Sequence, residues 1–188
     1  MTFDTRRSVL RKLVLGAAAL LASRLVPAGA AAVSPTTGKK WVAGQALDIA
    51  FTVATQAGGR VRRPYVAVWI EDAQGHPVRT LTVWAQTTGR GPRWIPDLRR
   101  WYRENSELLD TVSSPTRNPG SYAVAWDGKT DRGTLAPQGD YYVCIETARE
   151  HGPYSLVRER VTVGAAPFKK TLTANNDIEA ASVSFGKA

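Results

Sequence analysis

The residues that could build a reactive or metal-binding site are few, and most lie near the end of one predicted strand. The chain has two histidines, His76 and His151. His151 directly follows Glu150 and lies close in sequence to Glu146, so these three side chains could give a metal ion an oxygen and nitrogen ligand set. The simpler interpretation of both histidines is a solvated turn residue. We therefore expect no resident cofactor and keep a metal ion as the alternative.

Catalytic motifs are missing from the sequence. A hydrolase needs a nucleophile, a base and an orienting group held together. The chain contains no Gly-x-Ser-x-Gly elbow, His-Glu-x-x-His motif or phosphate loop. Asp127 and Asp131 superficially resemble a calcium loop, but Lys129 and Gln138 occupy positions where an EF-hand needs an oxygen ligand and a bidentate Glu. We expect that the protein is not an enzyme.

A second group of candidate residues combines tryptophan with arginine. Trp94 and Trp101 flank Pro96-Asp97, and Arg99 and Arg100 follow directly. Because Trp and Arg dominate binding hot spots, these two tryptophans and two arginines form a predicted partner-binding surface. The alternative is that Trp101 packs a helix onto a sheet while the arginines form the solvated face. A carbohydrate-binding surface around Trp94 is a third hypothesis.

Alternating apolar residues predict the strands that must position these side chains. The clearest pattern runs from Leu47 to Val53, and residues 65–71 are apolar on both faces, as expected for a central strand. That strand forms a predicted hairpin with residues 78–84. Residues 126–141, WDGKTDRGTLAPQGDY, separate two further alternating runs with turn-forming Asp, Gly and Pro. The simplest interpretation is a hairpin with a long polar connection.

The segment between these hairpins has a helical period. Leu98, Trp101, Leu108 and Val112 belong to one apolar face, and charged residues cover the other. We expect an amphipathic helix at about 97–113, with Asp97 as its N-cap. A further strand is predicted at 156–163, and weaker strand patterns follow at 168–173 and 181–185. The chain is therefore predicted to be mainly β, an antiparallel β-sandwich with one inserted helix.

The first residues have the pattern of an export signal. Thr5 to Leu10, TRRSVL, is a twin-arginine pattern, and the apolar segment from Leu13 to Leu21 is too short to span a bilayer. Small residues follow this apolar segment. Ala28-Gly29-Ala30 fits cleavage after Ala30, and Ala30-Ala31-Ala32 fits cleavage after Ala32. We expect residues 1–32 to be a twin-arginine signal peptide, a periplasmic location, and no transmembrane segment after cleavage.

Charge and cysteine content limit what the mature protein does. The formal charge of +9 falls to +5 once residues 1–30 are removed, and no basic block remains. Nucleic-acid binding is not expected, because it needs a clustered basic surface. The single cysteine, Cys144, excludes an internal disulfide and is expected to be a packing residue. We expect a flexible segment at 33–43 and one domain at 44–188.

Two resemblances support this interpretation. Residues 126–141 resemble the W-D-G-x-D-x-x-G-x-x-x-P-x-G-x-Y signature of the immunoglobulin-like domain of flagellar hook-capping proteins, with one extra residue between Gly128 and Asp131. Most of the mature chain is similar to the DUF2271 family of predicted periplasmic proteins. That similarity is carried by four motifs in the same order: VWIED (68–72), IPDLRRW (95–101), WDGK (126–129) and AREHG (148–152).

The family resemblance implies an immunoglobulin-like β-sandwich, an extracytoplasmic location and no established activity. Members occur beside PepSY-type membrane proteins and flavin-transfer enzymes, which is the basis for an alternative redox- or metal-linked function through His151 and nearby carboxylates. Our main expectation is an exported binding or accessory module. It would present the Trp/Arg-rich insert and the His-Gly turn to another periplasmic or membrane protein.

Overall fold

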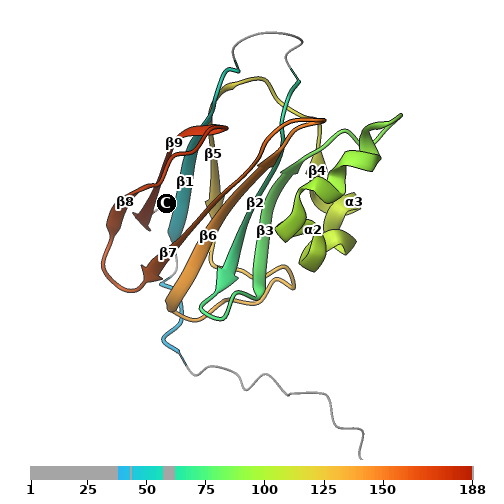
Figure 1. Cartoon of the computed structure of the whole chain (residues 1–188). Helices are drawn as coiled ribbons and strands as arrows, with labels where there is room; N and C mark the ends of the chain where they lie inside the picture. The colour runs from blue at the N-terminus through green and yellow to red at the C-terminus, as the bar shows by residue number, and fades with distance from the viewer. Residues whose placement is uncertain (1–37, 43, 57–61, 188) are drawn as a thin grey trace, which may run out of the picture. The chain divides into compact units, whose positions relative to one another are not determined.

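Two β-sheets form the framework that carries the candidate residues (Figure 1). The structure, a computed structural model, describes residues 38–42, 44–56 and 62–187. Within these residues the strand order is β5-β1-β9-β8 in one sheet and β4-β3-β2-β6-β7 in the other. All neighbours are antiparallel except the short pairing of β3 with β4. The strands are β1 (Gln45–Val53), β2 (Tyr65–Asp72), β3 (Pro77–Trp84), β4 (Ser113–Ser114), β5 (Gly120–Trp126), β6 (Gly139–Ala148), β7 (Tyr154–Val163), β8 (Phe168–Leu172) and β9 (Ile178–Lys187).

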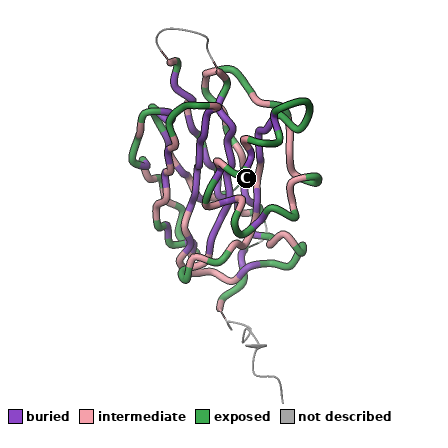
Figure 2. Tube along the Cα trace, turned by 45° about the vertical axis from the view of Figure 1, so that its right-hand side comes forward, coloured by how far each residue is buried: buried purple, intermediate pink, exposed green. Residues whose placement is uncertain are grey.

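The main hydrophobic core lies between the two sheets. Strand β1 contributes Leu47, Ile49 and Phe51 to it, and β2 contributes Val66 and Val68 from the opposite sheet. Figure 2 shows these buried strands running through the interior. The predicted antiparallel β-sandwich is therefore confirmed, and so are the central position of β2 and its hairpin with β3.

A second core covers the outer face of the five-stranded sheet. Trp69 of β2 and Cys144 of β6 point away from the sandwich interior and pack with Ile95, Leu98 and Trp101 of the insert. The insert consists of η1 (Gly91–Asp97), α2 (Arg99–Asn105), η2 (Ser106–Leu108) and α3 (Leu109–Val112). Its two α-helical pieces lie beside β3 in Figure 1. Strands β2 and β6 are apolar on both faces because each face meets a different core.

The inserted helix is interrupted, whereas one continuous helix was expected. Asn105 leaves the helical conformation (φ −138°, ψ 15°), and its side-chain amide donates to the Trp101 carbonyl at 3.2 Å. A short polar side chain that bonds the backbone in this way competes with helix propagation. Asp97 is also not the N-cap, since α2 begins after Leu98 with no side-chain cap from its own segment.

The connection between β5 and β6 crosses from one sheet to the other, so the expected hairpin there is wrong. Its turns are held by its own backbone and by β3. Asp131 accepts from the Thr80 amide at 3.1 Å, and the Asp131 amide donates to the Val78 carbonyl at 2.9 Å. Asp127 forms the expected Asx-turn by accepting from the Lys129 amide at 3.0 Å.

The N-terminal end of the described chain packs against this connection. Trp41 is 6% exposed and meets Trp126 and Phe185 edge to face, with ring centroids 4.8 and 5.2 Å apart. Its indole also lies against Gly128. The domain therefore begins at least as early as Trp41, which was expected to fall in the flexible segment 33–43. Residues 33–37 and 43 lie outside the described residues, as does the signal peptide expected at 1–32.

Alanine at two glycines of the β5–β6 connection separates backbone strain from steric conflict. Gly128 and Gly133 have nearly the same φ, +80° and +79°. A Cβ atom at Gly128 would lie 2.5 Å from the Trp41 ring, whereas one at Gly133 would meet nothing within 4 Å. We expect Gly133→Ala to lower the free energy of unfolding by about 1 kcal/mol through strain, and Gly128→Ala by about 1–3 kcal/mol more through overpacking. Urea denaturation measures both, and equal losses would contradict the packing of Trp41 on Gly128.

Candidate functional site

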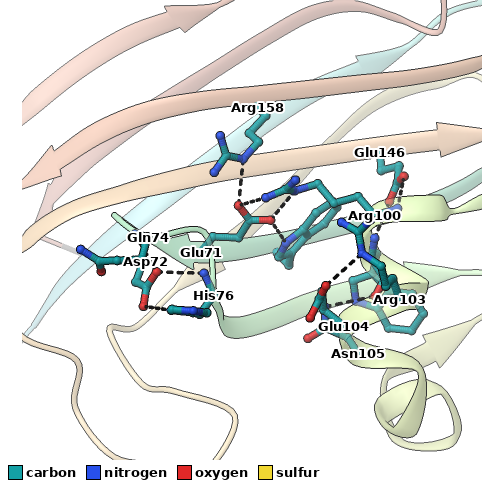
Figure 3. A network of polar contacts seen from close by, with 12 residues as sticks. Glu71, Asp72, Gln74, His76, Arg100, Arg103, Glu104, Asn105, Glu146 and Arg158 are labelled. Carbon is teal, nitrogen blue, oxygen red and sulfur yellow. Dashed lines mark hydrogen bonds and ion pairs between the residues drawn. The ribbon is translucent and has the colours of Figure 1, made fainter. Parts of the chain in front are cut away.

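A buried carboxylate on the outer face of β2 holds the insert onto the sheet (Figure 3). Glu71 is 2% exposed. Arg100 of α2 binds it in a bidentate manner, with Nε 2.7 Å from Oε1 and Nη2 2.8 Å from Oε2. Arg158 of β7 donates to Oε2 at 2.8 Å, and the Trp69 indole donates to Oε1 at 3.0 Å. One carboxylate therefore links β2, β7 and the insert.

The Glu71 carboxylate faces two guanidinium groups and one indole N–H. Burial raises the pKa of Glu71, but the hydrogen bonds from its three donors outweigh that effect and hold the pKa below its ordinary value. Glu71, Trp69, Arg100 and Arg158 are called the Glu71 cluster below. The β2–β3 turn passes over this cluster at Gly75, where a Cβ atom would lie 3.3 Å from Arg158 Nη2 and 3.4 Å from Arg100 Nη2. The arginine side chains are about one-quarter exposed, so the cluster is enclosed but not sealed from solvent.

A second buried carboxylate fixes the start of α2. Glu146 of β6 is fully buried, and its two oxygens each accept a backbone amide at 2.8 Å, from Arg100 and from Trp101. These amides belong to the first turn of the helix and have no partner within it. Burial raises the pKa of Glu146, and the two amide bonds oppose that rise. The N-cap function expected of Asp97 is thus supplied by a strand residue distant in sequence.

These contacts remove two residues from the predicted partner-binding surface. Trp101 is fully buried, and its indole donates to the Thr80 hydroxyl at 3.1 Å. Its interpretation as the residue that packs the insert onto the sheet is confirmed, and its inclusion in the surface is wrong. Arg100 is committed to Glu71 through two hydrogen bonds. Arg100 and Trp101 position the surface and do not form it.

The remaining candidates from the insert and from the His-Gly turn meet at one place. The Trp94 indole and the His151 imidazole contact each other edge to face, with ring centroids 4.5 Å apart. A small pocket of about 100 Å³ lies at this junction, lined by Trp94, Asp97, Arg99, Ala148, Arg149, His151, Gly152, Pro153 and Tyr154. The aromatic and charged side chains of this lining that are exposed or half-buried, together with His151, are called the Trp94–His151 surface below (Trp94, Asp97, Arg99, His151 and Tyr154).

The backbone of His151 is strained. Its φ of 52° is positive, and among the described residues no other non-glycine has a positive φ. The turn is closed by the Gly152 amide, which donates to the Arg149 carbonyl at 3.0 Å. Residues held in this conformation cluster at binding and catalytic sites, where the surrounding structure enforces it. Here the turn places the exposed imidazole against Trp94.

A buried ion pair anchors the other side of the same turn. Arg149 follows β6, and its Nε lies 2.8 Å from Oδ1 of Asp177, which precedes β9 in the opposite sheet. Both side chains are at most 5% exposed. Arg149 also donates to the Arg62 carbonyl, and Gln56 donates to Asp177 at 3.1 Å. The turn that carries His151 is therefore tied to both sheets.

The predicted metal ligands do not come together. Glu146 is occupied by the start of α2, and Glu150 forms an ion pair with Arg62 at 2.5 Å. His151 faces Trp94. Within residues 38–42, 44–56 and 62–187, no group of three His, Cys, Asp or Glu side chains is placed to hold a metal ion. The structure thus gives the predicted ligand set of Glu146, Glu150 and His151 no shared site.

The comparisons with known proteins identify the family. The model of the family described as "Predicted periplasmic protein (DUF2271)" matches residues 46–180. The chain belongs to this family. Neither curated proteins nor solved structures give a match. The resemblance of the β5–β6 connection to hook-capping proteins is not confirmed by these comparisons. No helix in the described part of the chain is long and apolar enough to cross a membrane.

The family match covers every strand that carries the candidate residues. It includes β2, β6 and β7 and the whole insert. Of the two carboxylates that hold these elements together, sequence reasoning missed Glu71 and predicted Glu146 only as a metal ligand. A signal for both was present, because each lies in phase with apolar residues on a strand face that is otherwise apolar. A lone carboxylate in such a face indicates a buried ion pair or cap.

Replacing Glu71 tests the cluster. We expect Glu71→Gln to lower the free energy of unfolding by about 2 kcal/mol at neutral pH, since two partly buried arginines lose their ionised partner. The matched control Glu104→Gln removes an exposed ion pair with Arg103 and should change it by less than about 0.5 kcal/mol. Urea denaturation provides both values.

The pH dependence of this effect has a definite sign. The folded-state pKa of Glu71 lies below its ordinary value of 4.5. The contribution of the ionised Glu71 to the free energy of unfolding is therefore fully present above that pH and is lost as the pH falls through the folded-state pKa. The advantage of the wild type over Glu71→Gln should therefore shrink as the pH drops below about 4.5. An advantage that persists undiminished in acid would contradict the ionised cluster.

Proposed function

We propose that the protein is a non-catalytic binding module of the periplasm that uses the Trp94–His151 surface to hold a protein partner. The observation that carries this proposal is the contact of Trp94 with His151, which comes from two segments far apart in the sequence. A packing role alone does not account for it, because His151 is exposed and held at positive φ. The family description supports the periplasmic location.

The surface has the features of a preorganised binding site. Its insert side is fixed by Glu71 and Glu146, and its turn side is fixed by the pair of Arg149 with Asp177. Because this region is already ordered, little binding free energy is lost in ordering it when a partner binds. Tryptophan and arginine are typical of the residues that dominate binding energy, and Trp94 is a half-buried aromatic side chain of this surface, as is Tyr154.

The alternative functions find less support. A metal- or redox-linked function needs a ligand set, and the three predicted ligands are not placed around one point. A carbohydrate-binding surface needs an open aromatic face, whereas the Arg93 guanidinium lies 5.3 Å over the Trp94 ring and His151 contacts the same ring. A protein partner tolerates both neighbours and gains polar contacts from them.

Photo-crosslinking in native cells tests for the partner. A benzoylphenylalanine in place of the exposed Pro92 lies in the same turn, η1, as Trp94, and one in place of Thr171, exposed on β8 of the other sheet, is the matched control. The proposal expects a specific adduct from position 92 and not from position 171, with the adduct identified by mass spectrometry. Adducts from position 171 alone would contradict it.

The identified partner then allows a direct affinity measurement. We expect Trp94→Ala to weaken binding by about thirtyfold, as for a central hot-spot residue. His151→Gly should weaken it by about fivefold or more while leaving the turn intact, because glycine adopts positive φ without strain. Leu135→Ala, at an exposed apolar residue of the β5–β6 connection, should have no effect. Equal losses for all three variants would contradict a localised site.

Export is proposed to use the twin-arginine route, on the basis of the TRRSVL pattern. Replacing Arg6 and Arg7 by lysine keeps the charge and removes the recognised pair. We expect the double variant to accumulate as precursor in the cytoplasm, measured by cell fractionation and immunoblotting. Undiminished export of the variant would show that the general secretory route is used.

A further inference from the structure

The Trp94–His151 surface and its border carry an excess of positive charge. Arg93 and Arg99 are exposed, and neither forms an ion pair within the described part of the chain. By contrast, the neighbouring Arg62 and Arg149 are neutralised by Glu150 and by Asp177. Asp97 is the single carboxylate among the described residues that line the pocket. The unmatched charge therefore belongs to Arg93 and Arg99.

These two arginines are held in a way that leaves their donors available. The Arg99 guanidinium lies 4.7 Å from the centre of the Tyr154 ring, and that of Arg93 lies 5.3 Å from the centre of the Trp94 ring. A guanidinium over an aromatic ring keeps its in-plane N–H donors free for a carboxylate. The contact also reduces the side-chain entropy lost on binding. The guanidinium groups of Arg93 and Arg99 are therefore positioned to bind an anionic group.

The size of the pocket limits what this anion belongs to. Its volume of about 100 Å³ is well below the several hundred Å³ of pockets that enclose a whole small-molecule ligand. It is comparable to the space of about three water molecules, which fits a carboxylate with one or two methylene groups. The pocket thus suits one side chain of a larger molecule that rests on the surrounding surface.

We propose that the partner presents an acidic segment, with one aspartate or glutamate side chain inserted between Arg99 and His151 and a neighbouring acidic residue on Arg93. This proposal rests on the proposed function, because it names the chemistry of the partner that the Trp94–His151 surface holds. It also assigns a role to Asp97. Its carboxylate lines the same pocket and opposes the entering anion, so it limits the affinity.

The test uses the mature exported protein and a fluorescently labelled peptide of about ten glutamates at low ionic strength, followed by anisotropy. A glutamine peptide of equal length is the uncharged control, and free glutamate is the competitor. The proposal expects the glutamate peptide to bind, the glutamine peptide not to bind, and free glutamate to compete only weakly. Competition by free glutamate at the same concentration as the peptide would overturn it in favour of a small-molecule site.

Charge variants show where the peptide binds. Arg99→Gln should weaken binding about fivefold or more, and Asp97→Asn should strengthen it about two- to fivefold, a direction that general loss of structure would not produce. Arg103→Gln removes the same charge from an exposed arginine that does not line the pocket and should change affinity less than twofold. Equal effects of Arg99→Gln and Arg103→Gln, or weaker binding by Asp97→Asn, would overturn the proposal.

The two proposals fail in different ways. If a crosslinked partner binds through Trp94 but the glutamate peptide neither binds nor competes with it, the acidic segment is wrong and the binding module stands. If position 92 gives no adduct, the proposed function fails whatever the peptide does.

Discussion

Two carboxylates buried on the outer face of one sheet hold the insert in place, and the candidate surface depends on them. A buried carboxylate is unfavourable by several kcal/mol unless charges or hydrogen bonds compensate it. Glu71 is compensated by Arg100, Arg158 and the Trp69 indole, and Glu146 by two helix amides. Because these donors come mostly from the insert, the insert can leave the sheet only by exposing or orphaning both carboxylates.

This constraint explains why a broken, short-helical segment is ordered. None of its helical pieces exceeds seven residues, so none would be stable alone. Apolar packing of Leu98 and Trp101 supplies the burial, and the two carboxylates fix the direction in which α2 starts. From that start the preceding turn η1 places Trp94 against the turn that follows β6. The same geometry that satisfies buried charges therefore builds the Trp94–His151 surface.

The sequence predicts local features of this arrangement well and long-range ones poorly. The strands around Leu47 and Val68, the two-sided burial of β2 and the packing of Cys144 follow from periodicity, and the structure confirms them. The hairpin at Trp126 was wrong because turn residues show that a chain bends, not which sheet it enters next. Asp97 was predicted as the N-cap because it directly precedes the helical pattern, but Glu146, far away in the sequence, accepts from the amides of the first turn instead. Likewise, Trp94 and His151 were candidates separately, and only the fold brings their rings together.

Hydrogen exchange at the amides of Arg100 and Trp101 tests the central claim most directly. If the Glu146 carboxylate binds both amides and the insert is held on the sheet, these amides should exchange as slowly as those in the middle of β2. The free energy of the opening that exposes them should then approach the free energy of global unfolding. Rapid exchange at both amides, with β2 still protected, would show that the insert opens independently of the sandwich. The Trp94–His151 surface would then not be preformed, and the account would be contradicted.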